Sequence, residues 1–312
     1  MRMKGIDGIH GLLFTVPVFW GTSYVAAKLG MLDLMPLNLA ILRFSLAALL
    51  FGSILLAKRC WRIAWRDLPQ FFLLGFVAIS FFYYLHYQAL QYTTSTNAGL
   101  LMATSPVFVL LFCMLKNREE VTSRSVLGIC LAFSGVMLVI TRGDFSGIYQ
   151  ARTLPGDLLV AVNALMWAWV TLRGKYVLEK YSPFTAMAYI HICGALLLLP
   201  FAFIRTPAAP ILLGEQLPGI HWMTVGVVVY LAVCCSVYSY FMWYYGVSRL
   251  GAVRTAVYNY FTPLIASLTG YLLFQEVLSG YVLGGGVLVI LGVWLTNHCR
   301  SGESLGAAEK IS

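Results

Sequence analysis

The sequence predicts an all-α integral membrane protein with ten transmembrane helices, arranged as two inverted repeats of five helices. Composition is the first observation: 60% of the 312 residues are hydrophobic and 11% are charged, whereas about a quarter of the residues in soluble domains are charged. A series of ten apolar runs is the second, and a similarity between the two halves of the chain is the third. Together they predict that lipid surrounds most of this chain.

The apolar runs have the length that a helix needs to cross a membrane, which is about 20 residues for roughly 30 Å of hydrocarbon. We expect helices because an isolated strand in lipid would leave its backbone groups unpaired. The runs span 9–32, 36–57, 68–90, 95–115, 125–141, 157–178, 183–204, 222–246, 252–274 and 280–296.

Lys and Arg residues are distributed unevenly between the two sides that these spans define. If the N-terminus is cytoplasmic, fifteen of them fall on the cytoplasmic side and three, Arg142, Arg152 and Arg205, on the opposite side. This asymmetry predicts cytoplasmic N- and C-termini in a bacterial-type inner membrane. It also accounts for the net charge of +9. No basic helix or aromatic RNA-binding pattern is present, so we expect no nucleic acid partner.

The two halves of the chain resemble each other. Ala89–Pro106 aligns with Gly246–Pro263 at an offset of 157 residues, and Trp20–Lys28 aligns with Trp167–Lys175 at an offset of 147. The loop from Arg205 to His221 can hold the ten extra residues of the second half. Because five spans per repeat is an odd number, the two copies must insert in opposite orientations.

The alignment predicts a first repeat at 9–141, a second at 156–297 and a cytoplasmic tail at 298–312. Inverted repeats are typical of secondary transporters, whose substrate site lies near mid-membrane where the repeats meet. The sequence therefore predicts a small-molecule substrate and membrane lipid as partners.

Several segments resemble the drug/metabolite transporter superfamily, specifically its EamA-type members. They are WGTSYVAAK in the first span, Arg43-Phe44 in the second, ALQYTTSTNAGLLMATSPVF entering the fourth, YNYFTPLIASLTGYLLFQEVLSG in the second copy and the Gly-rich final span. The resemblance implies ten helices around a central cavity, alternating access, and export of amino acids or related metabolites. It does not imply one substrate, because the superfamily also carries nucleotide sugars, cations and drugs.

Ionisable side chains inside a bilayer are costly and are therefore functional candidates. Every Asp and Glu lies in a loop or at a span end, whereas Lys28, Arg43 and Arg254 lie within or near spans. A planar guanidinium binds a carboxylate through two parallel bonds, which favours an anionic or zwitterionic substrate. The alternative is that these cations bond backbone carbonyls or extend to the interface, as we expect for Lys28.

The lack of an intramembrane carboxylate argues against the main alternative, a multidrug or organic-cation exporter. Such exporters exchange a proton on a buried acid against a cationic drug. Proton coupling here would fall to His86 or His191, although a membrane histidine also serves as a hydrogen-bonding packing residue.

The predicted substrate-binding residues are aromatic, polar or cationic side chains on the inward faces of several spans. Their aromatic members also fit an interfacial belt. The set comprises Trp20, Ser23, Tyr24, Arg43, Tyr83, Tyr87, Asn97, Asn163, Trp167, Thr171, Tyr240, Tyr244, Arg254, Tyr258 and Asn259.

Two further features concern helix geometry. Pro106 and Pro263 occupy aligned mid-span positions and predict hinges or static kinks. Glycines of the last span, including Gly285 and Gly292, predict a close helix contact, either inside the molecule or in a homodimer.

Enzyme and channel functions are the alternatives from other classes. No HExxH, GxSxG or nucleotide-binding loop is present, so we expect no catalytic residue and no cofactor. None of the seven cysteines forms a CxxC pair, so we expect no metal. A channel would show a filter-like ring or loop.

Overall fold

The computed structural model describes residues 4–93, 98, 101–116, 122–141, 154–206, 209–274 and 280–297. Within these ranges the chain is helical, and the only pairing of the β type is an isolated bridge between Thr206 and Ala209. The predicted all-α class is confirmed.

The first half of the chain contains one long helix in each of its first three predicted spans. Its elements are α1 (Lys4–Gly30), α2 (Pro36–Ala57), the short η1 (Trp65–Asp67), α3 (Leu68–Gly75), η2 (Phe76–Phe81), α4 (Phe82–Tyr92), α6 (Ser105–Lys116) and α7 (Ser123–Thr141). The elements η1, α3, η2 and α4 follow one another without a break and form a single helix from Trp65 to Tyr92.

The second half follows a similar plan. Its elements are α8 (Leu154–Lys180), α9 (Pro183–Leu198), η4 (Leu199–Ala202), α10 (Leu213–Gln216), η5 (Leu217–Gly219), α11 (Trp222–Tyr230), η6 (Leu231–Tyr238), α12 (Ser239–Leu250), α13 (Ala252–Ala256), η7 (Val257–Tyr260), α14 (Phe261–Phe274) and α15 (Gly280–Asn297). Pro36 and Pro183, which the alignment pairs, both stand in the first turn of their helices, where a missing N–H leaves no bond unmade.

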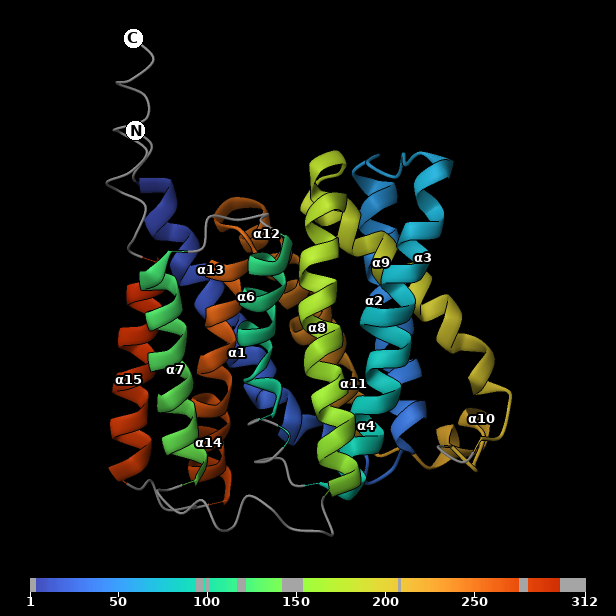
Figure 1. Ribbon diagram of the computed structural model, residues 1–312. Coiled ribbons are helices and arrows are strands. Elements are labelled where there is room, and N and C mark those ends of the chain that lie inside the picture. The colour runs from blue at the N-terminus through green and yellow to red at the C-terminus, as the bar shows by residue number, and fades with distance from the viewer. Residues whose placement is uncertain are drawn as a thin grey trace.

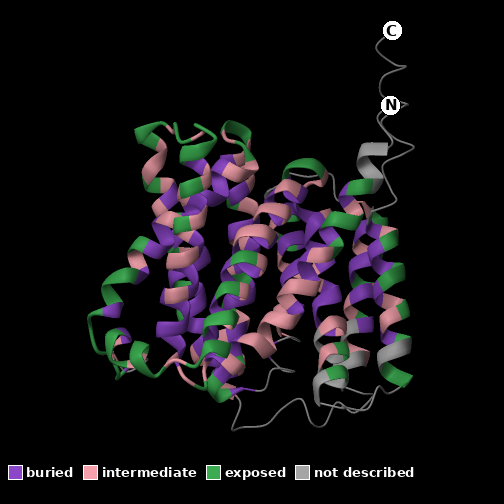
Figure 2. Ribbon diagram, turned by 180° about the vertical axis from the view of Figure 1, so that it is seen from behind, coloured by how far each residue is buried: buried purple, intermediate pink, exposed green. Residues whose placement is uncertain are grey.

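Six helices of the described residues are long and apolar enough to cross a membrane. They are Gly8–Gly30, Pro36–Ala57, Trp65–Tyr92, Leu154–Lys180, Pro183–Ala202 and Trp222–Leu250. Large hydrophobic side chains such as Leu49 and Leu115 point outward, and Figure 2 shows buried positions in the interior of the bundle with exposed ones on its outer faces. The chain is therefore a multi-pass membrane protein.

Helices α7 and α15 lie side by side at one edge of the bundle, and α8 stands between them and the group of α2, α3 and α9 (Figure 1). Glycines bring α7 and α15 together. A Cβ on Gly128 would lie 2.7 Å from the Gly292 carbonyl oxygen, and one on Gly135 would lie 2.5 Å from that of Gly285. The Gly-rich face of the last helix thus makes a contact inside the molecule.

Two segments of π-helix interrupt the two helices that the alignment pairs. They are η2 and η6, and they overlap when η2 is shifted by the offset of 157 residues. In η6 the Ser236 hydroxyl donates to the Leu231 carbonyl oxygen five residues earlier, at 3.0 Å. Segments of this kind are frequent at functional sites, and no pattern in the sequence predicts them.

Pro106 and Pro263 do not interrupt a regular α-helix. Pro106 is the second residue of α6, and Pro263 is the third residue of α14, directly after the 3₁₀ segment η7. Both stand in a first turn, the place where proline fits a helix best. Their role as hinges stays a prediction.

Candidate substrate-binding site

A cavity lies inside the bundle and is lined from both halves of the chain. Its volume is about 70 Å³, which is room for several water molecules. Its lining residues are Trp20, Ser23, Tyr24, Ala27, Arg43, Phe82, Tyr83, His86, Tyr87, Leu90, Met102, Ala103, Trp167, Tyr240, Asn259 and Thr262.

Arg43 of α2 is the charged residue of this cavity. Its side chain is 2% exposed. Its Nε donates to Ser236 Oγ at 2.9 Å, Nη1 donates to the Tyr87 hydroxyl at 3.1 Å, and Nη2 donates to the Tyr83 hydroxyl at 3.4 Å. Because a guanidinium carries five N–H groups, each terminal nitrogen keeps one N–H beyond these bonds.

The charge of Arg43 meets neutral groups. Its Cζ lies 4.7 Å from the centre of the Tyr83 ring and 4.9 Å from that of Phe44. Across the described ranges, no Asp or Glu side chain pairs with it. A buried cation without a counter-ion is costly, so an anionic group in the cavity would be stabilised there.

Residues at aligned positions of the two halves meet at this cavity. The hydroxyls of Tyr83 and Tyr240, which are 157 residues apart, lie 3.0 Å from each other. The rings of Trp20 and Trp167 meet edge to face with their centres 5.2 Å apart. The cavity therefore lies at the contact between the two halves.

The aligned residues His86 and Trp243 differ in size, and the cavity therefore lies on the His86 side. His86 of α4 lines the cavity, with its ring 5.7 Å from that of Tyr24. Trp243 of α12 stands at the aligned position, is fully buried, and packs 5.3 Å from Trp20 and 5.5 Å from Trp167. The larger indole fills the space that the imidazole leaves open on the other side.

A second difference concerns Tyr244 of α12 and Gly174 of α8. The ring of Tyr244 lies against Gly174, where a Cβ would come 2.6 Å from the tyrosine Cζ. The aligned residues of the first half, Tyr87 and Ala27, both line the cavity. In the second half Tyr244 thus packs against Gly174, whereas the aligned Tyr87 and Ala27 border the cavity in the first half.

Three lining residues have buried polar atoms without a hydrogen-bond partner among the residues that the structure describes. They are His86 Nδ1, Trp167 Nε1 and Thr262 Oγ1. Each such atom costs about 1–3 kcal/mol when it stays unpaired. Water or a polar ligand in the cavity would satisfy them, which makes the site suited to a ligand with both donors and acceptors.

Nine of the fifteen predicted residues line the cavity. They are Trp20, Ser23, Tyr24, Arg43, Tyr83, Tyr87, Trp167, Tyr240 and Asn259.

The other predicted residues lie elsewhere. Asn163 is buried in α8, the Thr171 hydroxyl donates to the Trp167 carbonyl at 2.8 Å, and Tyr258 bonds His10. Tyr244 and Arg254 are also outside the lining, the latter in α13 beyond the turn at Gly251. The last predicted residue, Asn97, lies outside the described residues.

Several lining residues are not among the predicted ones. Phe82, His86 and Leu90 follow one another at helical spacing on α4 beside the tyrosines. This spacing could have identified Phe82 and Leu90. For His86 the sequence left two roles open, proton coupling or hydrogen-bonded packing. Thr262 was not predicted to bind substrate, because attention at this place in the sequence fell on Pro263, the predicted hinge or kink.

These features define a class of protein: a multi-pass, all-helical membrane protein with a buried, partly polar cavity shared by both halves of its chain. The chain belongs to the EamA-like transporter family, whose sequence profile matches residues 9–141 and 154–298. The resemblance noted in the sequence is thereby confirmed. The protein is a transporter and not an enzyme, in agreement with the names of its relatives.

Individual relatives are similar over nearly their whole length. An uncharacterized transporter of Archaeoglobus fulgidus is 32% identical, over 92% of this chain and 96% of its own. The uncharacterized transporter YyaM of Bacillus subtilis is 27% identical, over 93% of each chain. A protein of Salmonella typhimurium named a probable amino-acid metabolite efflux pump is 28% identical, over 94% of this chain and 95% of its own.

The fold also occurs in a solved structure, titled only as the crystal structure of a protein. It superposes with a TM-score of 0.73 and covers 98% of this chain and 99% of that one, at 18% sequence identity. The two chains therefore share their fold.

Proposed function

We propose that this protein is a secondary-active transporter that exports amino acids or related carboxylate-bearing compounds by alternating access. The observation that carries the proposal is the guanidinium of Arg43. It is buried at the contact of the two halves, bonded to neutral hydroxyls, and keeps an N–H on each terminal nitrogen. A substrate carboxylate fits this pair of donors and supplies the missing negative charge.

The rest of the cavity fits the remainder of such a substrate. Trp20, Trp167 and Phe82 offer apolar ring surface, and His86 and Thr262 offer the unpartnered polar atoms. A zwitterion with an apolar side chain would use both kinds of surface. The name of the Salmonella typhimurium relative agrees with this substrate class.

The proposed architecture is ten transmembrane helices in two inverted repeats, 9–141 and 156–297, in an inner membrane with both termini and the tail 298–312 in the cytoplasm. Figure 1 supports it in two ways. Helices α1 and α8, which the alignment pairs, run in opposite directions, and α15 ends on the side where α1 begins. An even number of crossings and an inversion of the second half both agree with these directions.

The second candidate is an exporter of organic cations, and the aromatic walls favour it. Rings such as those of Trp20 and Trp167 attract cations. The charge of Arg43 opposes it, because a like charge within the same cavity repels the ligand. We therefore place the carboxylate substrate first.

A thermal-shift screen of the purified protein tests the choice. Amino acids, organic acids and organic cations are compared for the rise in melting temperature that each produces. We expect amino acids to stabilise the wild type and to lose this effect in Arg43→Gln. Arg249→Gln is the matched control, because Arg249 lies over the Tyr245 ring away from the cavity. Stabilisation by cations alone, unchanged in Arg43→Gln, contradicts the proposal.

Saturable counterflow in proteoliposomes separates this carrier from a channel. A carrier exchanges labelled for unlabelled substrate across the membrane, whereas a channel cannot drive such exchange. Flux that does not saturate and shows no counterflow overturns the carrier mechanism.

A further inference from the structure

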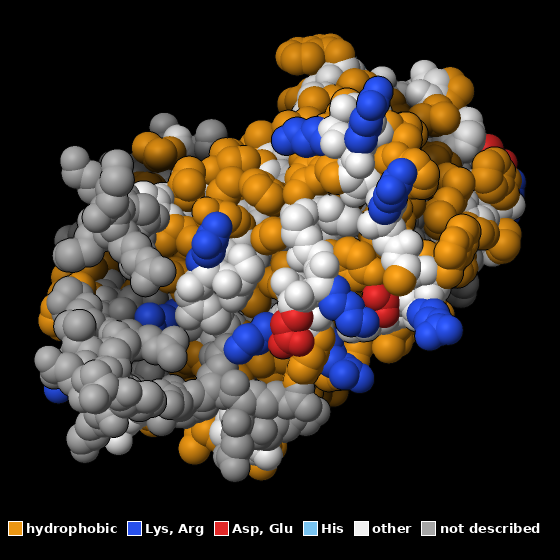
Figure 3. All heavy atoms as spheres, turned by 90° about the horizontal axis from the view of Figure 1, so that it is seen from above, with side chains coloured by type: hydrophobic (Ala, Val, Ile, Leu, Met, Phe, Trp, Pro, Cys, Tyr) orange, Lys and Arg blue, Asp and Glu red, His pale blue; other side chains and the backbone are white. Residues whose placement is uncertain are grey.

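We propose that the loop Lys58–Arg66, with the two tryptophans it carries, binds the phosphate headgroup of an anionic phospholipid. This Lys58–Arg66 surface lies between α2 and α3, away from the cavity. Figure 3 looks onto that end of the molecule, where Lys and Arg side chains stand among hydrophobic ones. The site is separate from substrate binding and does not depend on the proposed transport function.

Three arginines of this surface are exposed to solvent, and the structure shows no partner for their charges among the described residues. Within the described part of the chain, Arg59, Arg62 and Arg66 have no ion pair and no aromatic ring beneath them. Other cations at the same end are engaged, since Arg173 lies 5.8 Å from the Trp169 ring and Arg249 lies over Tyr245. Arginine side chains bind phosphate oxygens through two parallel bonds, so three such arginines on one loop offer several donors to a phosphate group.

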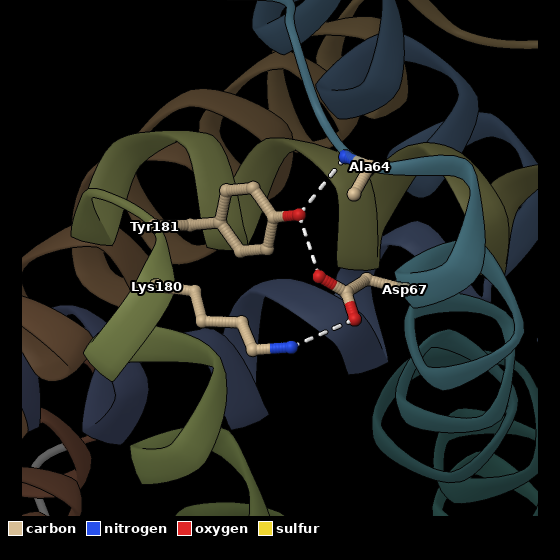
Figure 4. Close-up of polar contacts among 4 residues, drawn as sticks. All are labelled: Ala64, Asp67, Lys180 and Tyr181. Carbon is tan, nitrogen blue, oxygen red and sulfur yellow. Dashed lines mark hydrogen bonds and ion pairs between the residues drawn. The ribbon is translucent and has the colours of Figure 1, made fainter.

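The nearby carboxylate does not neutralise these arginines. Asp67 accepts hydrogen bonds from Lys180 Nζ at 3.0 Å and from the Tyr181 hydroxyl at 2.7 Å (Figure 4). Both partners come from the end of α8 and the turn after it. The negative charge of Asp67 is therefore paired with Lys180 and does not neutralise the loop arginines. Their positive charge remains available to a ligand.

The loop is held in a defined shape. The Ala64 N–H donates to the Tyr181 hydroxyl at 3.0 Å (Figure 4), and the Tyr189 hydroxyl donates to the Trp61 carbonyl. Arg59 adopts a φ of 52°, the left-handed conformation that glycine usually supplies after a helix. A site whose backbone is already ordered loses less entropy when a ligand binds.

The tryptophans identify the ligand as a lipid and not free phosphate. Trp65 is 85% exposed and Trp61 is 51% exposed, and both stand beside the arginines at the end of the bundle. Exposed indole rings prefer the headgroup level of a bilayer, where one edge meets acyl chains and the other meets water. Basic residues next to such rings attract anionic headgroups.

The aligned loop of the second half lacks these features. Between Arg205 and His221 the sequence has one Lys or Arg, which is Arg205 itself. That residue pairs with Glu215 at 2.6 Å. The basic surface is therefore particular to one end of the molecule, as binding to one leaflet requires.

Native mass spectrometry of the full-length protein in neutral detergent tests the proposal. Phosphatidylglycerol and phosphatidylcholine are titrated, and the apparent affinity of each is measured. We expect phosphatidylglycerol to bind at least tenfold more tightly. At about fivefold per arginine, Arg62→Gln/Arg66→Gln should weaken phosphatidylglycerol binding about 25-fold. Arg173→Gln/Arg249→Gln, the matched control, should change it less than twofold.

A second variant and a competitor complete the test. Trp61→Ala/Trp65→Ala keeps every charge and should weaken phosphatidylglycerol binding, which remains measurable if the arginine variant does not fold. Millimolar inorganic phosphate should leave bound lipid in place. The proposal is overturned if the two lipids bind equally, if both arginine variants lose binding equally, if the tryptophan variant binds like the wild type, or if phosphate displaces the lipid.

Discussion

The hydroxyls of Tyr83 and Tyr240 lie 3.0 Å apart although 157 residues separate them along the chain. This separation equals the offset that aligns the two halves. Because the two tyrosines occupy aligned positions, this pair lies where the two halves of the chain meet. Arg43 reaches the same point, because it donates to Tyr83.

The two tyrosines should contribute unequally to ligand binding. Tyr83→Phe removes a bond to Arg43 as well as the bond to Tyr240, whereas Tyr240→Phe removes only the second. Bonds to charged groups are worth about 1.5–3 kcal/mol, so Tyr83→Phe should weaken amino-acid binding about tenfold and Tyr240→Phe less than threefold. Calorimetric titration measures both. Equal losses would mean that Arg43 is not oriented by Tyr83.

Loss of the Arg43 charge should abolish ligand binding but leave the stability of the fold nearly unchanged. Because the buried cation lacks a counter-ion among the described residues, Arg43→Gln should melt within a few degrees of the wild type without ligand. It should lose the ligand-induced rise in melting temperature. Arg43→Lys keeps the charge but not the two-pronged geometry, and we expect a partial rise. A collapse of the folded state in Arg43→Gln would make this residue structural.

Substitutions at the aligned positions His86 and Trp243 should change the volume of the cavity. His86→Trp places an indole where Trp243 already fills the aligned position, so ligand binding should vanish while the protein stays folded. Trp243→His removes a fully buried ring and should destabilise the fold by about 3 kcal/mol. Both variants are read by ligand titration and thermal melting. Unchanged binding in His86→Trp would exclude this side of the cavity as the ligand site.

The contact of α7 with α15 should not tolerate added methyl groups. A Cβ on Gly292 would lie 2.6 Å from the Ala132 backbone nitrogen, so the helices must move apart. Gly292→Ala should cost about 1–3 kcal/mol and lower the melting temperature. Gly280→Ala is the control, because no described residue lies within 4 Å of its added Cβ. Equal melting of both variants contradicts the close contact.

Acid should weaken the contact between the end of α1 and the start of α11. The Thr224 hydroxyl and the His221 backbone N–H donate to the Asp33 carboxylate, at 2.5 and 3.0 Å, and hold its pKa below the ordinary value. This contact therefore stabilises the fold fully above the ordinary carboxyl pKa of about 4. The contribution is lost as pH falls through the lowered folded pKa.

Melting curves between pH 7 and pH 3 measure this effect. The melting temperature of Asp33→Asn should be lower at pH 7 and should fall less steeply below about pH 4. Glu179→Gln, which removes an exposed carboxyl elsewhere, should follow the wild type. Parallel curves for Asp33→Asn and the wild type would show that this contact contributes nothing.

Sequence reasoning located most of the helices and the central side chains, for identifiable reasons. The apolar runs are long enough to predict helices at α1, α2 and α8 without any packing information. Arg43 stood out because a charge inside an apolar run is rare. The alignment placed Trp20 with Trp167 and Tyr83 with Tyr240, and these pairs do meet.

Other features depend on packing that periodicity does not encode. The spacing of residues locates a helix face but does not show which residue of an aligned pair borders a cavity and which is packed in the interior. The sequence therefore did not distinguish the roles of His86 and Trp243. The π-helical segments shift the face of a helix partway along it. Arg254 was predicted because it is a guanidinium near a predicted span, and the structure puts it outside the cavity, beyond the turn at Gly251.

The most direct test of the central claim is counterflow of a labelled amino acid in proteoliposomes, competed by the unlabelled amino acid and by the amine that lacks its carboxylate. The account predicts that the amino acid competes, that the amine does not, and that Arg43→Gln abolishes counterflow while Arg249→Gln retains it. Equal competition by the amine, together with normal counterflow in Arg43→Gln, would contradict recognition of a carboxylate by Arg43.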